Sequence, residues 1–159
     1  MQLNSVKLAN LAVMVSLVFP AYHFKIREEE GGPVIFDPLR RRWVKLSPEE
    51  WVRQNMMQYL LQTMCYPSAL VGVEKEIKLG SLRKRFDLLV YNRDHQPWMV
   101  LECKAMEVPL TQSVLDQVLL YRLSLSCRYM VITNGETCYA YETQGDQLIS
   151  LTSLPSFPA

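Results

Sequence analysis

Two strand-like runs joined by a short turn restrict the folds open to this chain more than any other feature. Residues 86–91 (FDLLVY) and 98–104 (WMVLECK) are rich in apolar and aromatic side chains, and residues 92–97 (NRDHQP) have the composition of a reversal. Side chains on a strand point alternately to opposite faces, so Glu102 and Lys104 are expected on one face of the second strand. The sequence therefore predicts an antiparallel pair that carries an acid and an amine on a common surface.

The first of these strands contributes a further acid, Asp87, next to the acid and amine of the second. Hydrolysis of a phosphodiester has to accommodate a proton leaving water and a negative charge growing on phosphate. Mg²⁺ assists both steps, because it binds through a few carboxylates, keeps several waters and lowers the pKa of a bound one. We therefore expect Asp87 and Glu102 to be metal ligands, and Lys104 to orient water or to neutralise transition-state charge. Two such carboxylates repel each other and tend to hold a proton between them until a cation arrives.

A simpler interpretation is an ion pair between Glu102 and Lys104 on a solvated face. Such a pair contributes roughly 0 to 1 kcal/mol. Trp98 and Val100 precede these residues on the same face, and unpaired charge beside apolar side chains is unfavourable. The context favours a functional site, and both interpretations stay open on the residues alone.

Several motifs around these residues resemble the PD-(D/E)XK nuclease superfamily, and within it the N-terminal nuclease domain of type I restriction enzyme R subunits. The likeness covers approximately residues 19–152. In chain order the motifs are residues 35–44 (IFDPLRRRWV), 47–54 (SPEEWVRQ), 83–87 (RKRFD), 101–105 (LECKA), 116–121 (DQVLLY) and 133–135 (TNG). Phe86 stands where proline is frequent in the superfamily, and the 159 residues contain no Walker-type glycine loop or other motor motif.

The resemblance implies an α/β fold with a restriction-endonuclease-like core, in which helices flank a mixed central β-sheet. It implies a Mg²⁺-dependent endonuclease, with Mn²⁺ as a substitute metal. Asp87 and Glu102 match the metal ligands of the family, and Lys104 matches its catalytic lysine. A glutamate on the first core helix usually completes the set, and Gln117 matches an extra helical motif of restriction-type members.

That first core helix is predicted from Ser47 to about residue 63. Ser47 is suited to the N-cap and is followed by proline, while Glu50 occupies the capping-box position. Helical spacing places Glu49 three residues before Val52, on the stripe that faces the sheet, and Glu50 about 100° away. This spacing favours Glu49 in the site, the family pattern leaves Glu50 open, and either residue also suits the helix dipole.

Further elements follow from the pattern downstream. Residues 70–79 are predicted to form a strand with Glu74 and Glu76 on an exposed polar face, and residues 111–125 a second helix. Gln117 falls close to the inward boundary of that helix. It is expected either to bond the metal-site lysine or a DNA backbone atom, or to cap a buried backbone group.

The C-terminal part is predicted to be a hairpin followed by one more strand. Residues 128–133 and 137–142 flank Asn134-Gly135, which is a strong hairpin signal, and residues 147–151 are expected to form an edge strand.

Composition indicates an ordinary folded domain. Of the 159 residues, 49% are hydrophobic and 21% are charged, and the net charge is only +1. Contacts with nucleic acid must therefore come from local clusters. There are two such clusters, residues 40–42 (RRR) with Lys45, and Arg83, Lys84 and Arg85. Runs of this kind are more often solvated loops than binding grooves. The second cluster is the better candidate for nucleic-acid contact, because it leads directly into the strand that contains Asp87.

The chain divides into an apolar N-terminal extension (residues 1–18), a nuclease-like domain (residues 19–152) and a flexible tail (residues 153–159). The extension has the character of a short signal-peptide segment but no cleavage pattern, and initiation at Met14 is a competing explanation. Its apolar part is too short for a comfortable membrane span. A cytoplasmic protein without a membrane association is the expectation.

Taken together, the sequence predicts a Mg²⁺-dependent deoxyribonuclease. The alternative is a nuclease-like module that binds nucleic acid or a restriction or repair complex without cleaving, and the residues do not distinguish DNA from RNA. One centre of this kind cuts one strand, so double-strand cleavage requires a homodimer or a larger restriction or defence assembly. The sequence does not indicate which bases of a nucleic acid would be recognised.

Overall fold

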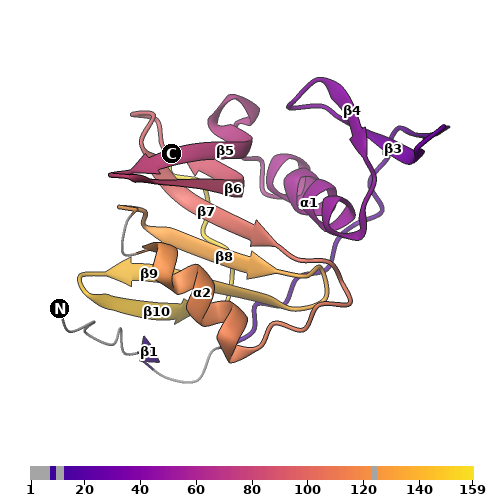
Figure 1. Cartoon of the computed structure of the whole chain (residues 1–159). Coiled ribbons are helices and arrows are strands. Elements are labelled where there is room, and N and C mark those ends of the chain that lie inside the picture. Colours follow the sequence, from indigo (N-terminus) through magenta and orange to yellow (C-terminus); the bar gives the residue numbers. More distant parts are fainter. Residues whose placement is uncertain (1–7, 10–12, 123–124) are drawn as a thin grey trace.

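A computed structural model describes residues 8–9, 13–122 and 125–159 of the chain. Its centre is a seven-stranded sheet in the order β1-β10-β9-β8-β7-β6-β5 (Figure 1). The strands are β1 (Leu8–Ala9), β5 (Val71–Leu79), β6 (Leu82–Tyr91), β7 (Pro97–Cys103), β8 (Tyr129–Thr133), β9 (Cys138–Gln144) and β10 (Gln147–Leu151). The pairs β7/β8 and β1/β10 are parallel and the others are antiparallel, so the sheet is mixed.

Helices cover the two faces of this sheet. α1 (Pro48–Gln58) precedes the β5-β6-β7 meander, and α2 (Gln112–Arg122) makes the crossover between the parallel strands β7 and β8. The predicted α/β fold, with a mixed central sheet flanked by helices, is confirmed. The predicted meander and the hairpin between β8 and β9 are confirmed as well. The last strand is present as predicted, but it is not an edge strand, because β1 pairs with its outer side. At the hairpin turn, Gly135 has a φ of +90°, which glycine adopts without strain.

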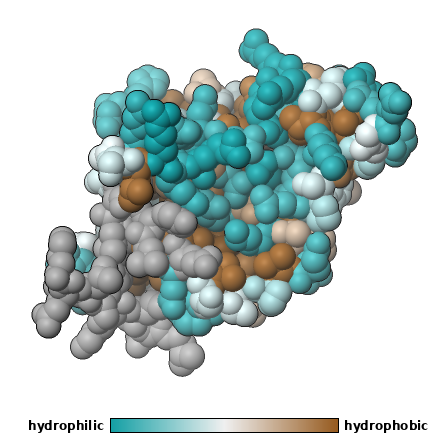
Figure 2. Space-filling view, in the orientation of Figure 1, coloured by the Kyte–Doolittle hydropathy of each residue, from teal (hydrophilic) through white to brown (hydrophobic). Residues whose placement is uncertain are grey.

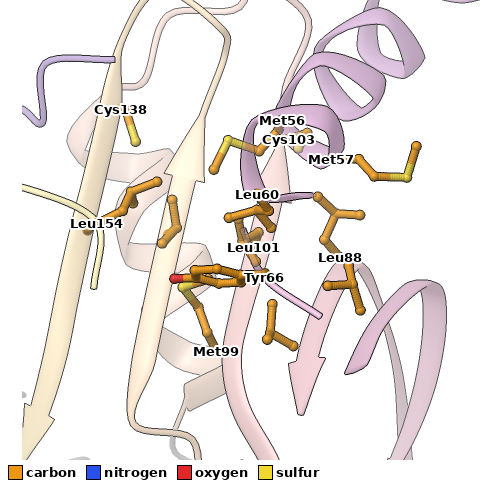
Figure 3. Close-up of a cluster of buried hydrophobic side chains, with 14 of the residues drawn as sticks. Met56, Met57, Leu60, Tyr66, Leu88, Met99, Leu101, Cys103, Cys138 and Leu154 are labelled. Carbon is orange, nitrogen blue, oxygen red and sulfur yellow. The ribbon is translucent and has the colours of Figure 1, made fainter. Parts of the chain in front are cut away.

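Two hydrophobic clusters fill the space between sheet and helices. The cluster on the α1 side contains Met56 and Leu60 from the helix region and Leu101 from β7 (Figure 3). The cluster on the α2 side contains Leu115 from the helix and Val100 from β7. Neighbouring residues of β7 therefore serve opposite faces, which is the reason that its residues before Glu102 are apolar. Trp98 was expected on the face of Val100, but it packs in the α1-side cluster, because the β6-β7 register shifts at this end of the strand.

The first helix begins as predicted. The Ser47 side chain accepts the backbone N–H of Glu50 at 3.1 Å, and Pro48 occupies the first helical position. The regular α-helix ends at Gln58, and a π-helical turn (Tyr59–Thr63) completes the predicted span. Both α1 and this turn pack on the sheet, which fixes the start of the helix near the end of β7.

A separate three-stranded sheet lies beside the start of α1 (Figure 1). Its antiparallel strands are β2 (Ile26–Glu29), β3 (Gly32–Asp37) and β4 (Arg42–Lys45), in the order β2-β3-β4. Hydrophilic side chains cover much of the face shown in Figure 2, with small hydrophobic patches between them. The turn between β3 and β4 brings Asp37 and Arg40 into contact with Glu50 and Gln54 of α1.

Both ends of the described chain pack on the large sheet. Val15 and Leu17, from the segment predicted to be an extension, are buried in the core. The tail expected to be loose places Leu154 in the same core and Phe157 against Trp98, with ring centroids 5.5 Å apart. Apolar side chains hold both segments. Among the described residues, no helix combines the length and the hydrophobicity that a membrane crossing requires.

Candidate active site

The two predicted metal ligands lie where β6 and β7 part. The last paired positions of these strands are Leu88 and Leu101, so Asp87 and Glu102 lie one residue beyond the ladder. The Oδ2 atom of Asp87 accepts the backbone N–H of Cys103 at 2.8 Å. A hydrogen bond from the backbone to the Asp87 side chain thus replaces the next backbone–backbone bond between β6 and β7. The two strands part at this point, next to the carboxyl groups of Asp87 and Glu102.

The carboxyl group of Glu102 is buried and incompletely satisfied. Glu102 is 8% exposed, and among the described residues its Oε1 atom has no hydrogen-bond partner. Burial, together with the negative charge of Asp87 and a hydrogen bond to it, raises the pKa of Glu102 from 4.5 to about 8. In the metal-free protein at pH 7 this group therefore carries a proton, as expected for adjacent carboxyl groups.

Lys104 follows β7 directly, and its charge acts on two of the acids. Its backbone N–H donates to the carbonyl of Thr133 at 2.8 Å, and its side chain is half-buried. The ammonium charge lowers the pKa of both Glu49 and Glu102, against the larger effect of burial, which raises the pKa of each. The structure therefore brings this lysine close to both carboxyl groups.

Arg53 of α1 joins the helix to β6, the strand that contains Asp87. Its Nη2 atom lies 2.5 Å from Oδ1 of Asp87 and 3.4 Å from Oε1 of Glu49. Its Nη1 atom donates to Glu50 and lies 3.8 Å from Oε1 of Glu74. Burial lowers the pKa of the guanidinium, but the negative charges of Asp87 and Glu50 outweigh it and raise that pKa above its ordinary value.

A second arginine, Arg40, connects the small sheet to the same acids. Its Nε atom lies 2.7 Å from Oδ2 of Asp37, its Nη2 atom 2.5 Å from Oε1 of Glu50, and its Nη1 atom 2.8 Å from Oε2 of Glu74. The amide of Gln54 donates to Asp37 and to Glu50, at 2.9 Å in each case. The turn after β3 is thereby bonded to α1 and to β5.

Glu74 differs from its expected position. It was predicted on an exposed polar face, but it is half-buried and paired with Arg40 and Arg53. Its φ of +50° is uncommon for a residue with a side chain, and the β5-β6 ladder is interrupted here, since it pairs Val73 with Leu88 and Lys75 with Phe86 but leaves Glu74 out. The irregular backbone brings this carboxylate into the arginine network, whereas the neighbouring Glu76 is exposed and pairs with Arg83.

The two helix glutamates divide between two environments. Glu50, and not Glu49, lies on the buried face, because Arg40 and Arg53 both neutralise its charge. The side chain of Glu49 is 46% exposed, and its pKa is raised by burial and by the charge of Asp87. Glu49 thus lies near Asp87 of β6 and Glu50 within the network, and the catalytic role of each stays a prediction.

The remaining predicted site residues are Gln117 of α2 and the basic cluster of β6. Gln117 belongs to α2, but its side chain lies outside the described residues. On β6, Arg83 and Arg85 are exposed and Lys84 is half-buried, and the positive charge of Lys84 lowers the pKa of Glu102. Binding of nucleic acid by these three residues stays a prediction.

The donor set fits a hard divalent cation, although the described residues do not hold a ready-made cage. Among them, no group of three or more His, Cys, Asp and Glu side chains is arranged to hold a metal ion. Asp87 and Glu102 nevertheless offer carboxyl oxygens at one point, and the Oε1 atom of Glu102 has no partner there. Oxygen ligands of this kind suit Mg²⁺, which keeps several of its waters.

Five residues of the arginine network were not singled out in the sequence as parts of the site. They are Asp37, Arg40, Arg53, Gln54 and Glu74. Spacing contained part of the signal, because Glu50, Arg53 and Gln54 follow the i, i+3, i+4 rule for one helix face. The contacts of Arg40 with Glu50 and Glu74 span 10 and 34 residues, and no local pattern reports them.

A family model described as the type I restriction enzyme R protein N terminus matches residues 48–158. The matched region contains α1, the β5-β6-β7 meander, α2 and the last three strands, and hence most of the site. The resemblance seen in the motifs is thereby confirmed. A search of curated proteins finds no match.

Two solved structures are similar over parts of the chain. One is a candidate nuclease of DUF820 from Anabaena variabilis ATCC 29413, at 11% identity and a TM-score of 0.49, covering 82% of this chain and 86% of the other. The other is the type IIG restriction endonuclease BpuSI, at 18% identity and a TM-score of 0.40, covering 60% of this chain and 11% of the other. Both structural similarities are weak, and the assignment of the chain to a family rests on the family model.

Proposed function

Because this chain belongs to the family of type I restriction enzyme R protein N-termini, we propose that it is a Mg²⁺-dependent endonuclease that hydrolyses phosphodiester bonds of DNA. The observation that carries the proposal is the opening between β6 and β7, where Asp87 and Glu102 meet and Lys104 approaches them. A nuclease-like fold provides the scaffold. Mn²⁺ is expected to substitute for Mg²⁺ at this site.

Each residue has a distinct task in the proposed reaction. Asp87 and Glu102 hold the cation, which supplies a polarised phosphoryl oxygen and an acidified water when it is bound. Glu102 gives up its proton on binding, because a coordinating carboxylate is ionised. Lys104 orients the attacking water or neutralises negative charge on the phosphate. Glu49, near both the lysine and the metal strand, completes the acidic side of the site.

DNA is the proposed substrate, and one centre cuts one strand. Arg83 and Arg85 are exposed on β6, the strand that carries Asp87, where they can contact a phosphate backbone. Cleavage of both strands would then need a second copy of the chain or a larger restriction assembly. An RNA substrate stays open. Cleavage assays on single- and double-stranded DNA and RNA distinguish the two kinds of substrate.

A non-cleaving binding module is the second candidate, and two observations favour it. Asp87 is occupied by Arg53 at 2.5 Å, and the described residues contain no prearranged group of three metal ligands. A protein of this kind would bind nucleic acid through Arg83 and Arg85 without needing a cation. Mg²⁺ or Mn²⁺ would then give no thermal stabilisation beyond the effect of ionic strength.

Replacing Lys104 by alanine is expected to reduce plasmid nicking by about 100-fold, the lower range for a positioned acid–base group. The wild-type protein should nick supercoiled plasmid with Mg²⁺ and stop on addition of EDTA. Lys78→Ala is the matched control, because Lys78 is an exposed lysine on β5. Activity that survives Lys104→Ala at the wild-type rate, or that is insensitive to EDTA, rejects the proposed function.

A further inference from the structure

Arg53 occupies the carboxylate that the proposed function assigns to the metal. In Asp87, Oδ1 lies 2.5 Å from Nη2 of Arg53, and Oδ2 accepts the backbone N–H of Cys103 at 2.8 Å. Both carboxylate oxygens are therefore engaged in the structure. A divalent cation at Oδ1 would meet a guanidinium on the same atom, and like charges so close together repel strongly in a poorly solvated site.

The guanidinium has other acceptors within reach. Glu49 lies 3.4 Å from Nη2, and Nη1 already donates to Glu50 and lies 3.8 Å from Glu74. The Nε atom of Arg53 is buried and without a hydrogen-bond partner among the described residues. A small shift away from Asp87 would therefore keep the arginine paired, because three further carboxyl groups surround it.

The charges around this point also leave room for a cation. The acidic side chains of the network and the metal strands are Asp37, Glu49, Glu50, Glu74, Asp87 and Glu102. The basic side chains that contact or face them here include Arg40, Arg53, Lys84 and Lys104. With Asp87 released to a divalent ion, Arg53 would still have partners of opposite charge.

We propose that Arg53 is a positioning residue that competes with the metal for Asp87 and thereby sets the metal affinity of the site. It neutralises Asp87 in the metal-free protein and transfers its contact to Glu49, Glu50 and Glu74 when the cation binds. This inference rests on the proposed function, because it requires Asp87 to be a metal ligand. It adds a residue of α1 to the determinants of metal binding.

Arg40 provides the matched comparison. It has the same charge, is half-buried in the same network and pairs with Glu50 and Glu74, but the structure gives it no contact with Asp87. Loss of either arginine removes one positive charge and weakens the network. Only the loss of Arg53 removes a competitor from the metal ligand itself.

Calorimetric titration of the full chain with Mn²⁺ and with Mg²⁺, together with thermal unfolding, tests the inference. Arg53→Met is expected to lower the melting temperature of the metal-free protein and to tighten metal binding by about tenfold, because a counter-ion at the ligand is gone. Arg40→Met should also lower the melting temperature, but should change the affinity by less than about threefold, since its charge acts from farther away.

Equal tightening in the two variants would overturn the inference in favour of a general charge effect, and weaker binding by Arg53→Met would overturn it directly. If Arg53→Met does not fold, Arg53→Lys serves instead. The lysine ammonium is compact and lacks the forked donors with which the guanidinium holds Asp87. Arg53→Lys should therefore bind the metal more tightly than the wild type, and an unchanged metal affinity overturns the proposal. Metal binding by Arg53→Met but not by the wild type supports the inference. If neither the wild type nor any variant binds the metal, the proposed function is rejected as well.

Discussion

Replacing Glu102 by glutamine is expected to stabilise the metal-free protein at pH 8 while it abolishes metal-dependent cleavage. The pKa of Glu102 is raised from 4.5 to about 8, mainly by burial. The folded protein therefore retains a proton that the unfolded chain releases between these two pH values, and the wild type loses stability as the pH rises through this interval. A neutral carboxamide does not titrate, so the variant should be more stable at pH 8 by about 4 kcal/mol.

Cleavage should change in the opposite direction. A carboxamide cannot supply the negative charge that holds the metal, and loss of several kcal/mol of assistance corresponds to a rate decrease of about a thousandfold. Urea unfolding at several pH values in EDTA measures the stability, and plasmid nicking with Mg²⁺ measures the rate. Glu136→Gln, at an exposed turn position, is the control and should leave both unchanged. Parallel pH profiles for the Glu102 variant and the wild type would contradict the assignment.

Local sequence patterns were sufficient for the elements that deliver the predicted triad. Alternation and the turn composition located β6 and β7, and these strands bring Asp87, Glu102 and Lys104 to one opening. Capping chemistry located the start of α1, with the Ser47 side chain on the Glu50 N–H. Such signals involve residues a few positions apart, and the physics behind them is local.

The same patterns were insufficient where distant segments determine burial. Helical spacing from Val52 favoured Glu49 as the inward acid, but Arg40 arrives from the turn after β3 and, with Arg53, makes burial of Glu50 favourable. Glu74 was expected in water for the same reason, since its pairing with Arg40 spans 34 residues. Charged residues are placed by their partners, and their partners are set by the tertiary fold.

The ends of the chain show a related limit. Leu154 and Phe157 belong to a segment whose prolines predicted a loose tail, yet they pack in the core and on Trp98. Prolines restrict local backbone conformation without deciding whether a segment finds an apolar surface. The opening at β6 and β7 is thus readable from sequence, whereas the arginine network and the packed ends require the structure.

Asp37→Ala is expected to destabilise the fold by about 3–5 kcal/mol, since it leaves buried charged and polar groups without their partner. Asp37 is fully buried, and its carboxylate accepts the backbone N–H groups of Leu39 and Arg40 at 2.9 and 2.7 Å. It also accepts the Nε–H of Arg40 at 2.7 Å and the amide of Gln54 at 2.9 Å. Deleting it affects the turn after β3 and the arginine that connects this turn to α1 and β5.

Two further variants separate the contributions of Asp37, measured as free energies of unfolding in urea and EDTA. Asp37→Asn keeps an oxygen for the two backbone donors but sets an amide N–H₂ against Arg40 and Gln54, so it should destabilise by about 2 kcal/mol. Asp94→Ala removes an exposed aspartate and should stay within about 0.5 kcal/mol of the wild type. An Asp37→Ala protein as stable as Asp94→Ala would show that the network does not hold the small sheet against the helix, because its loss would then leave the packing intact.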